Sequence, residues 1–124
     1  MDEIVTDSQL AQSVPMQQPD PIPQPGVASS HRAASDDFDH MGFDAPTVAL
    51  MRDWIYTREL HGWQSYGTLL CPDNGRDSGR DAIEENADLV AYLRNWLREG
   101  AQVQTEYEMA ARLLGRFVHL VSPP

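Results

Sequence analysis

Hydrophobic positions in the second half of the chain recur every three or four residues, which is the spacing of α-helices. A helix is expected to start at Asp44-Ala45-Pro46, where a capping acid precedes a proline in the first turn, and to stop at Gly62. Two more helices are expected over 78–98 and 102–121, with Ser78 and Asp81 as a capping box for the first of them. The pattern therefore predicts an all-α fold with a three-helix core over about residues 46–121.

The first 45 residues lack this periodicity. Five of the nine prolines fall between Pro15 and Pro25, and alternating prolines favour an extended polyproline II chain. Eight acids and a single base, Arg32, make the segment strongly acidic. We therefore predict two parts: a disordered or extended, acidic, Pro/Gln-rich arm over 1–45 and a helical domain over 46–124. Such an arm is either inert or becomes ordered on a partner.

Charge and cysteine content exclude several classes of protein. The chain of 124 residues has 19 acids against nine basic residues, a net charge of −10, which argues against binding to nucleic acid or to an anionic membrane. Its one cysteine, Cys71, excludes an internal disulfide and a cysteine zinc site. No stretch approaches the roughly 20 apolar residues of a membrane span, and no secretory signal is visible. We expect a soluble, cytoplasmic protein.

The predicted helix over 78–98 carries a concentrated acidic face. At about 100° per residue, Asp81, Glu84, Glu85 and Asp88 share an arc of about 100°. Like charges one turn apart repel each other, and a hard divalent cation such as Mg²⁺ would offset that repulsion because it prefers carboxylate oxygens. The alternative is an acidic face that is simply solvated, as on many small acidic proteins.

Three motifs in one stretch resemble a known family. Tyr66-Gly67 is followed by the loop Asn74-Gly75-Arg76-Asp77 and then by Asp81-Ala82-Ile83-Glu84-Glu85-Asn86-Ala87-Asp88-Leu89-Val90-Ala91-Tyr92-Leu93. Over about residues 48–98, this order and register resemble short phage-encoded proteins of the MazG-like group, which are all-α nucleoside triphosphate pyrophosphohydrolases.

The resemblance implies a helical bundle, usually oligomeric, that binds magnesium and splits nucleoside triphosphates into monophosphate and pyrophosphate. It implies that Glu85 and Asp88 are metal ligands, with Asp81 on the same face as a third, and that Glu84, Glu85 and Asp88 form the catalytic set.

One part of the family's metal site has no counterpart here. Full-length members of the family carry a Glu-x-x-Glu pair on the preceding helix, whereas this chain offers only Asp53 and Glu59, six residues apart. The missing ligands would have to come from another segment, for which Glu106 and Glu108 are candidates, or from another chain.

Residues near the loop are candidates for substrate binding. The Arg76 guanidinium suits a bidentate phosphate contact, although a salt bridge to Asp73 or Asp77 is an equal alternative. Tyr66 and Trp63 could stack on a base, but such residues more often fill the gap between helices.

Two hypotheses of function follow. The first is a Mg²⁺-dependent nucleotide pyrophosphohydrolase of the MazG-like type, which would act on the nucleotide pool in the cytoplasm of a bacterial host. The second is a non-catalytic phage interaction or structural protein, associated with the virion, whose N-terminal arm docks on a partner. In both cases we expect a homo-oligomer, because the third helix has a broad apolar face, and we expect no nucleic-acid or membrane partner.

Overall fold

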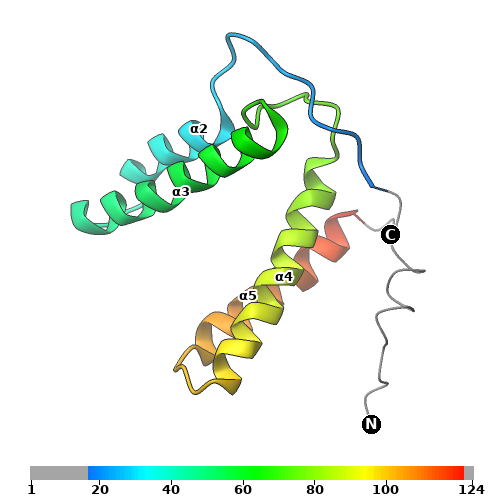
Figure 1. Cartoon of the computed structure of the whole chain (residues 1–124). Helices are drawn as coiled ribbons and strands as arrows, with labels where there is room; N and C mark the ends of the chain where they lie inside the picture. The colour runs from blue at the N-terminus through cyan, green and yellow to red at the C-terminus, as the bar shows by residue number, and fades with distance from the viewer. Residues whose placement is uncertain (1–16, 122–124) are drawn as a thin grey trace. The chain divides into compact units, whose positions relative to one another are not determined.

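The computed structural model describes residues 17–121, and the regular structure in this range is helical throughout (Figure 1). In chain order the elements are α2 (Ser30–Asp37), the short 3-10 helix η1 (Phe38–His40), α3 (Ala45–Tyr66), α4 (Ser78–Arg98) and α5 (Gln104–Val121). The predicted all-α fold class is confirmed.

The chain divides into two compact units, Met1–Arg76 and Asp77–Pro124. In the first unit α2 packs on α3, and in the second unit α4 packs on α5. The division therefore falls well after residue 45, where the sequence pattern placed it. The predicted three-helix core is replaced by two helix pairs, because α3 has α2 as its partner within its own unit.

Helix α3 begins as predicted and ends later than predicted. The Asp44 carboxylate accepts a hydrogen bond of 2.8 Å from the backbone N–H of Thr47, which caps the first turn. The helix then continues through Gly62 and ends at Gly67, whose φ of 70° is left-handed and whose N–H donates to the Trp63 carbonyl. The predicted stop at Gly62 is wrong because one interior glycine costs a helix only about 1 kcal/mol.

Helices α4 and α5 form a hairpin. The predicted range 78–98 for α4 is confirmed, but its cap is Asp77, whose carboxylate accepts from the Arg80 N–H at 3.0 Å. The predicted capping box of Ser78 and Asp81 is therefore wrong by one residue. Gly100, with a φ of 99°, lies in the connection, and α5 begins two residues later than predicted.

The N-terminal segment differs from the predicted arm in two ways. First, Ser30–Asp37 is helical, with the Ser29 hydroxyl accepting from the backbone N–H of Arg32 at 3.2 Å. Second, residues 17–29 are held by the loop that follows α3. The Ile22 N–H donates to the Asn74 carbonyl at 2.8 Å. Part of the predicted arm is thus integral to the first unit, while residues 1–16 of it lie outside the described residues.

The interior of each unit contains few apolar side chains. Among the described residues, only Val48, Cys71 and Ala110 are buried apolar residues. The buried polar residues are Ser29, Ser35, Glu59, Asn74 and Asn86. Polar contacts therefore contribute an unusually large part of the contacts between the helices, and many large apolar side chains are exposed.

Candidate functional site

The most elaborate polar site joins α2 to α3 and centres on Glu59. This carboxylate is only 8% exposed. The Arg32 guanidinium donates to it from Nη2 at 2.9 Å and from Nε at 3.1 and 3.3 Å, and the Ser29 hydroxyl also donates to it. The same guanidinium lies 3.8 Å from the centre of the Tyr56 ring. Glu59 thus has a bidentate cation and a hydroxyl as partners.

The network extends along the same two helices. The Ser35 and Tyr56 hydroxyls are 2.8 Å apart, and Arg52 Nε donates to Ser35 Oγ at 2.9 Å. Arg52 Nη2 reaches the Asp39 carboxylate at 2.7 Å. We call this set the polar seam; it comprises Ser29, Arg32, Ser35, Asp39, Arg52, Tyr56 and Glu59. Its groups satisfy one another across the helix pair, which is what a structural network requires.

Charge in the polar seam is fixed at neutral pH. The hydrogen bond from Arg32 lowers the pKa of Glu59, the bond from Ser29 adds to this, and burial works in the opposite direction. Hydrogen bonds to Glu59 and Asp39 raise the pKa of Arg32 and Arg52 respectively. A carboxylate with a lowered pKa that is held by a guanidinium and a hydroxyl is a poor general base, so the polar seam has no evident catalytic chemistry.

The four acids predicted as a metal site all lie on α4. Glu84, Glu85 and Asp88 are exposed, and Asp81 is half-buried. Glu84 accepts from Arg80 Nε at 3.0 Å, an ion pair within one helix. Within residues 17–121, no three His, Cys, Asp or Glu side chains are grouped closely enough to hold a metal ion.

The acids considered as further ligands in the sequence analysis form no metal site with the acids of α4 among the described residues. Glu59 is engaged by Arg32, and Asp53 is exposed on α3. Glu106 and Glu108 are exposed on α5 and belong to no metal-binding group in the part of the chain that the structure describes.

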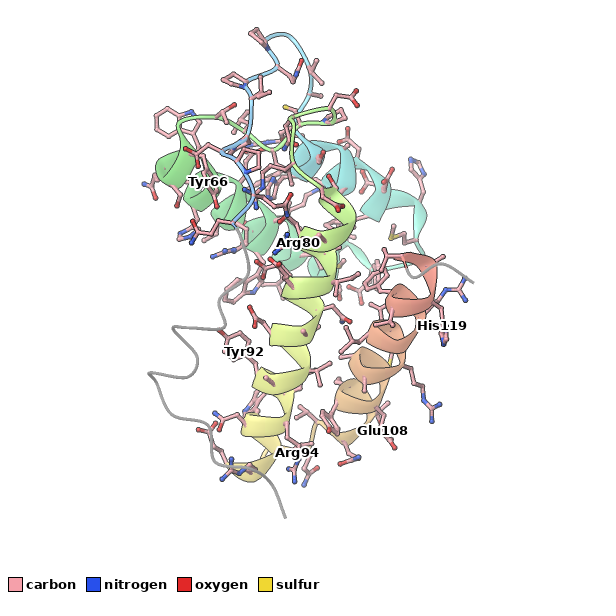
Figure 2. The ribbon with its side chains drawn as sticks, turned by 90° about the vertical axis from the view of Figure 1, so that its right-hand side faces the viewer. Tyr66, Arg80, Tyr92, Arg94, Glu108 and His119 are labelled. Carbon is pink, nitrogen blue, oxygen red and sulfur yellow. The ribbon has the colours of Figure 1, made fainter. Side chains whose placement is uncertain are left out.

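The two predicted substrate residues, Arg76 and Tyr66, are brought together. The Arg76 guanidinium carbon lies 6.0 Å from the centre of the Tyr66 ring, and Nη1 donates to the Pro19 carbonyl at 2.8 Å. Tyr66 lies at the C-terminal end of α3 (Figure 2). Tyr66 and Trp63 are each 53% exposed, so neither fills a gap between helices. Arg76 links the end of α3 to the N-terminal segment.

Large apolar side chains are exposed over both units. All three tryptophans are more than half exposed: Trp54 by 73%, Trp63 by 53% and Trp96 by 54%. The other large apolar residues that are exposed in the described range are Ile22, Val27, Met41, Phe43, Leu50, Leu60, Tyr66, Leu69, Leu70, Leu89, Tyr92, Met109, Leu113, Val118, Leu120 and Val121. Scattered exposed leucines are ordinary, but tryptophans exposed on both helix pairs are not.

Nothing in the local sequence pattern marked the polar seam, because its members are spread over 31 positions and four of them, Ser29, Arg32, Ser35 and Asp39, fall in the segment predicted as an extended arm. One signal was present. Arg32 is the single base among the first 45 residues, and Glu59 falls on the mainly apolar part of the predicted helix.

Comparisons of the chain with models of protein families, with curated proteins and with solved structures give no match. None of the described helices combines the length and the apolar character needed to span a membrane.

Proposed function

We propose that this chain is a non-catalytic helical interaction protein whose exposed aromatic and aliphatic side chains bind another protein surface. One observation carries the proposal. In residues 17–121 three apolar side chains are buried, while nineteen large apolar side chains, including every tryptophan, are exposed. Tryptophan and tyrosine are enriched at protein interfaces, where a few of them supply most of the binding energy.

The polar seam also supports this proposal, because it explains how the first unit is stable while its tryptophans are exposed. It holds α2 on α3 through ion pairs and hydrogen bonds in which neither tryptophan of the first unit takes part. Trp54 is on α3 and remains exposed. A helix pair held together by polar contacts leaves its apolar side chains available to a partner.

The proposed binding surface differs from the one in the sequence analysis, which was the N-terminal arm. Gln24 Nε2 donates to the Asp73 carbonyl at 2.9 Å, and Arg76 donates to the Pro19 carbonyl, so residues 17–29 are already occupied within the first unit. The helices, rather than this part of the arm, present the exposed apolar side chains.

A pyrophosphate-release assay tests the non-catalytic part of the proposal. The purified chain is incubated with each ribo- and deoxyribonucleoside triphosphate and with Mg²⁺ or Mn²⁺. We expect no release above a no-protein control. Release that disappears in the Glu85→Gln, Asp88→Asn double variant would overturn the proposal.

Site-specific photo-crosslinking tests the binding part. A photoreactive phenylalanine at position 54 is compared with the same group at position 53, the neighbouring exposed site on α3. We expect one discrete protein adduct at position 54 and none at position 53. Identical patterns at the two positions, or none, would contradict a specific apolar surface.

A second candidate, a MazG-like nucleotide pyrophosphohydrolase, is favoured by one observation. Glu85 and Asp88 are exposed one helical turn apart on α4 and form no ion pair with another described residue. Because magnesium is usually held by one or two carboxylates together with phosphates and water, this pair could hold the ion with Asp81 nearby. When bound, magnesium would polarise the phosphoryl oxygens. The same assay tests this candidate with the opposite expected result.

A further inference from the structure

The loop that follows α3 contains the one asparagine of the chain that precedes a glycine. Asn74 is followed by Gly75, whereas the other two asparagines, Asn86 and Asn95, precede an alanine and a tryptophan. Asparagine is among the thermally labile residues of proteins. Its side-chain amide is lost most easily before glycine, because glycine has no Cβ to hinder attack by its own backbone nitrogen. Asn74 is therefore the most reactive asparagine of this sequence.

The fold of the first unit buries this asparagine. Asn74 is 2% exposed. Its Oδ1 accepts a hydrogen bond of 3.1 Å from the backbone N–H of Arg76, while its Nδ2 is buried without a hydrogen-bond partner among the described residues. A buried polar group without a partner is unfavourable and calls for a specific explanation. The loop thus holds a labile amide in the interior although one of its two polar atoms is unpaired.

The segment over 17–29 binds the backbone on both sides of the Asn74 side chain. The Asn74 carbonyl accepts from the Ile22 N–H at 2.8 Å, and the Asp73 carbonyl accepts from Gln24 Nε2 at 2.9 Å. Figure 1 shows this segment, in blue, beside the green loop that follows α3. The carbonyl of the labile residue is therefore itself one of the groups that hold the segment.

The next two residues of the loop also contact the segment. A Cβ added to Gly75, whose φ is 82°, would lie 3.0 Å from Ile22 Cδ1, so the close approach of these two residues requires glycine. Arg76 Nη1 donates to the Pro19 carbonyl at 2.8 Å. Each residue over 73–76 thus holds the segment, and the bond between Asn74 and Gly75 is at the centre of the contact.

We propose that Asn74 is a deamidation site whose reaction releases the segment over 17–29. The Gly75 nitrogen bonds to Asn74 Cγ, the Cγ–Nδ2 bond breaks, and Nδ2 leaves as ammonia with the proton that the Gly75 nitrogen gives up through water. A second water then adds to one of the two carbonyls of the cyclic imide and breaks its bond to the Gly75 nitrogen, which regains a proton. The product is aspartate or isoaspartate, and no atom is oxidised or reduced.

Docking of the segment controls when the reaction occurs. In the folded chain Asn74 is buried and its Oδ1 is held by Arg76, so the amide meets neither water nor the Gly75 nitrogen in the required geometry. Because the segment contacts the loop on both sides of Asn74, it must detach first. The rate of deamidation is then the intrinsic rate multiplied by the fraction of molecules in which the segment is detached.

The product does not hold the segment as the asparagine does. Aspartate places a charged oxygen where the buried Nδ2 was, and a buried charge without donors is strongly unfavourable. Isoaspartate carries the main chain through Cγ, so the carbonyl that accepts from the Ile22 N–H becomes part of a free carboxylate. Either product favours the detached segment, and the loss of ammonia makes the change one-way. This release goes beyond the proposed function and is independent of it.

Peptide mapping by mass spectrometry tests the site. The full chain is incubated at mildly alkaline pH, and we expect both products at Asn74 with none at Asn86 or Asn95 over the same time. Ile22→Ala should raise the rate at Asn74 at least about threefold, because loss of a partly buried aliphatic contact favours detachment. Leu50→Ala, the matched change at an exposed aliphatic residue of α3, should leave the rate unchanged. No excess reaction at Asn74, or equal rates in the two variants, would refute the proposal.

Amide hydrogen exchange tests the release. Asn74→Asp, which reproduces the charge of one product, should raise the exchange rate of the Ile22 amide at least about tenfold, because a buried carboxylate favours the detached segment. Asn95→Asp, the same change at an exposed asparagine of α4, is the control and should not alter it. Circular dichroism should show equal helicity in both variants.

The reacted wild type gives the same comparison without a substitution. Ion exchange separates chains that carry the extra negative charge from unreacted chains of the same incubation. We expect faster exchange of the Ile22 amide in the reacted fraction only. Equally slow exchange in the two fractions would overturn the release of the segment, whatever the stability of the Asn74→Asp variant.

Discussion

At the scale of single residues, the Glu59–Arg32 pair joins α2 to α3. Its two members are unequal, since the Glu59 side chain is 10% exposed and the Arg32 side chain 54%. Removal of the carboxylate leaves a cation that water can solvate. Removal of the arginine leaves a buried carboxylate with only the Ser29 hydroxyl as a partner. The second change should therefore be the more damaging.

Glu59→Gln is expected to lower the free energy of unfolding by about 2 kcal/mol, the order of a hydrogen bond to a charged group. Chemical denaturation followed by circular dichroism measures this change. Asp53→Asn, at an exposed site on the same helix, is the control and should stay within about 0.5 kcal/mol of wild type. Equal stability of the two variants would contradict a stabilising role for the polar seam.

Acid should weaken the same contact. The pKa of Glu59 lies below its ordinary value of 4.5 in the folded chain, so the ion pair stabilises fully above that value and is lost as the pH falls through the folded pKa. We expect the unfolding free energy of wild type to fall more steeply below about pH 4.5 than that of Glu59→Gln. The hydrogen bonds from Thr47 also lower the pKa of Asp44. The unfolding free energy of both wild type and Glu59→Gln should therefore still fall with pH in this range because of Asp44. Parallel curves would contradict this prediction.

At the scale of helices, alanine should have opposite effects at Gly62, inside α3, and at Gly67, the C-cap of α3. Gly62 is inside the helix, with no atom within 4 Å of an added Cβ. Gly67 also has open space, but its φ of 70° is left-handed. Gly62→Ala should therefore stabilise the chain by up to about 1 kcal/mol, and Gly67→Ala should destabilise it by about 1 kcal/mol.

Thermal unfolding of both alanine variants checks these signs, with each variant serving as the other's control. If Gly62→Ala lowered the melting temperature and Gly67→Ala did not, the helix would end at Gly62, as the sequence pattern suggested.

The comparison of α4 with α2 shows what the sequence determines locally. The range of α4 was predictable because a cap, a 3.6-residue period and Gly100 all agree over 21 residues. The eight residues of α2, Ser-His-Arg-Ala-Ala-Ser-Asp-Asp, have no apolar stripe. Its stabilising contacts come from Glu59, 27 positions beyond Arg32, and a local pattern cannot register such a contact.

Site prediction met the same limit. The acidic face of α4 follows from spacing alone, and its members are on that helix as expected. Whether this face binds a metal depends on further acids from distant parts of the chain. Among the described residues no group of three His, Cys, Asp or Glu side chains could hold a metal ion. Glu59, which spacing gave no role, is instead the centre of the polar seam.

At the scale of the whole molecule, the net charge of −10 makes stability sensitive to salt. Because the described acids form no metal-binding group, we expect millimolar MgCl₂ and NaCl of equal ionic strength to raise the melting temperature equally, through screening. Differential scanning fluorimetry measures both. A rise specific to Mg²⁺ and absent from the Glu85→Gln, Asp88→Asn variant would favour the pyrophosphohydrolase candidate.

Burial of Cys71 makes the single thiol of the chain a chemical reporter of local opening. Its Sγ lies 3.7 Å from the Val27 carbonyl oxygen, so a disulfide reagent reaches the thiol once the segment over 17–29 leaves the loop over 67–76. The Ile22 side chain lies close to Gly75 at the far end of this contact. Ile22→Asp should therefore speed modification, and Leu120→Asp in the other unit should not. The ratio of the Ile22→Asp rate to the wild-type rate gives the change in the free energy of detachment that the substitution causes, and equal rates would place the thiol's protection elsewhere.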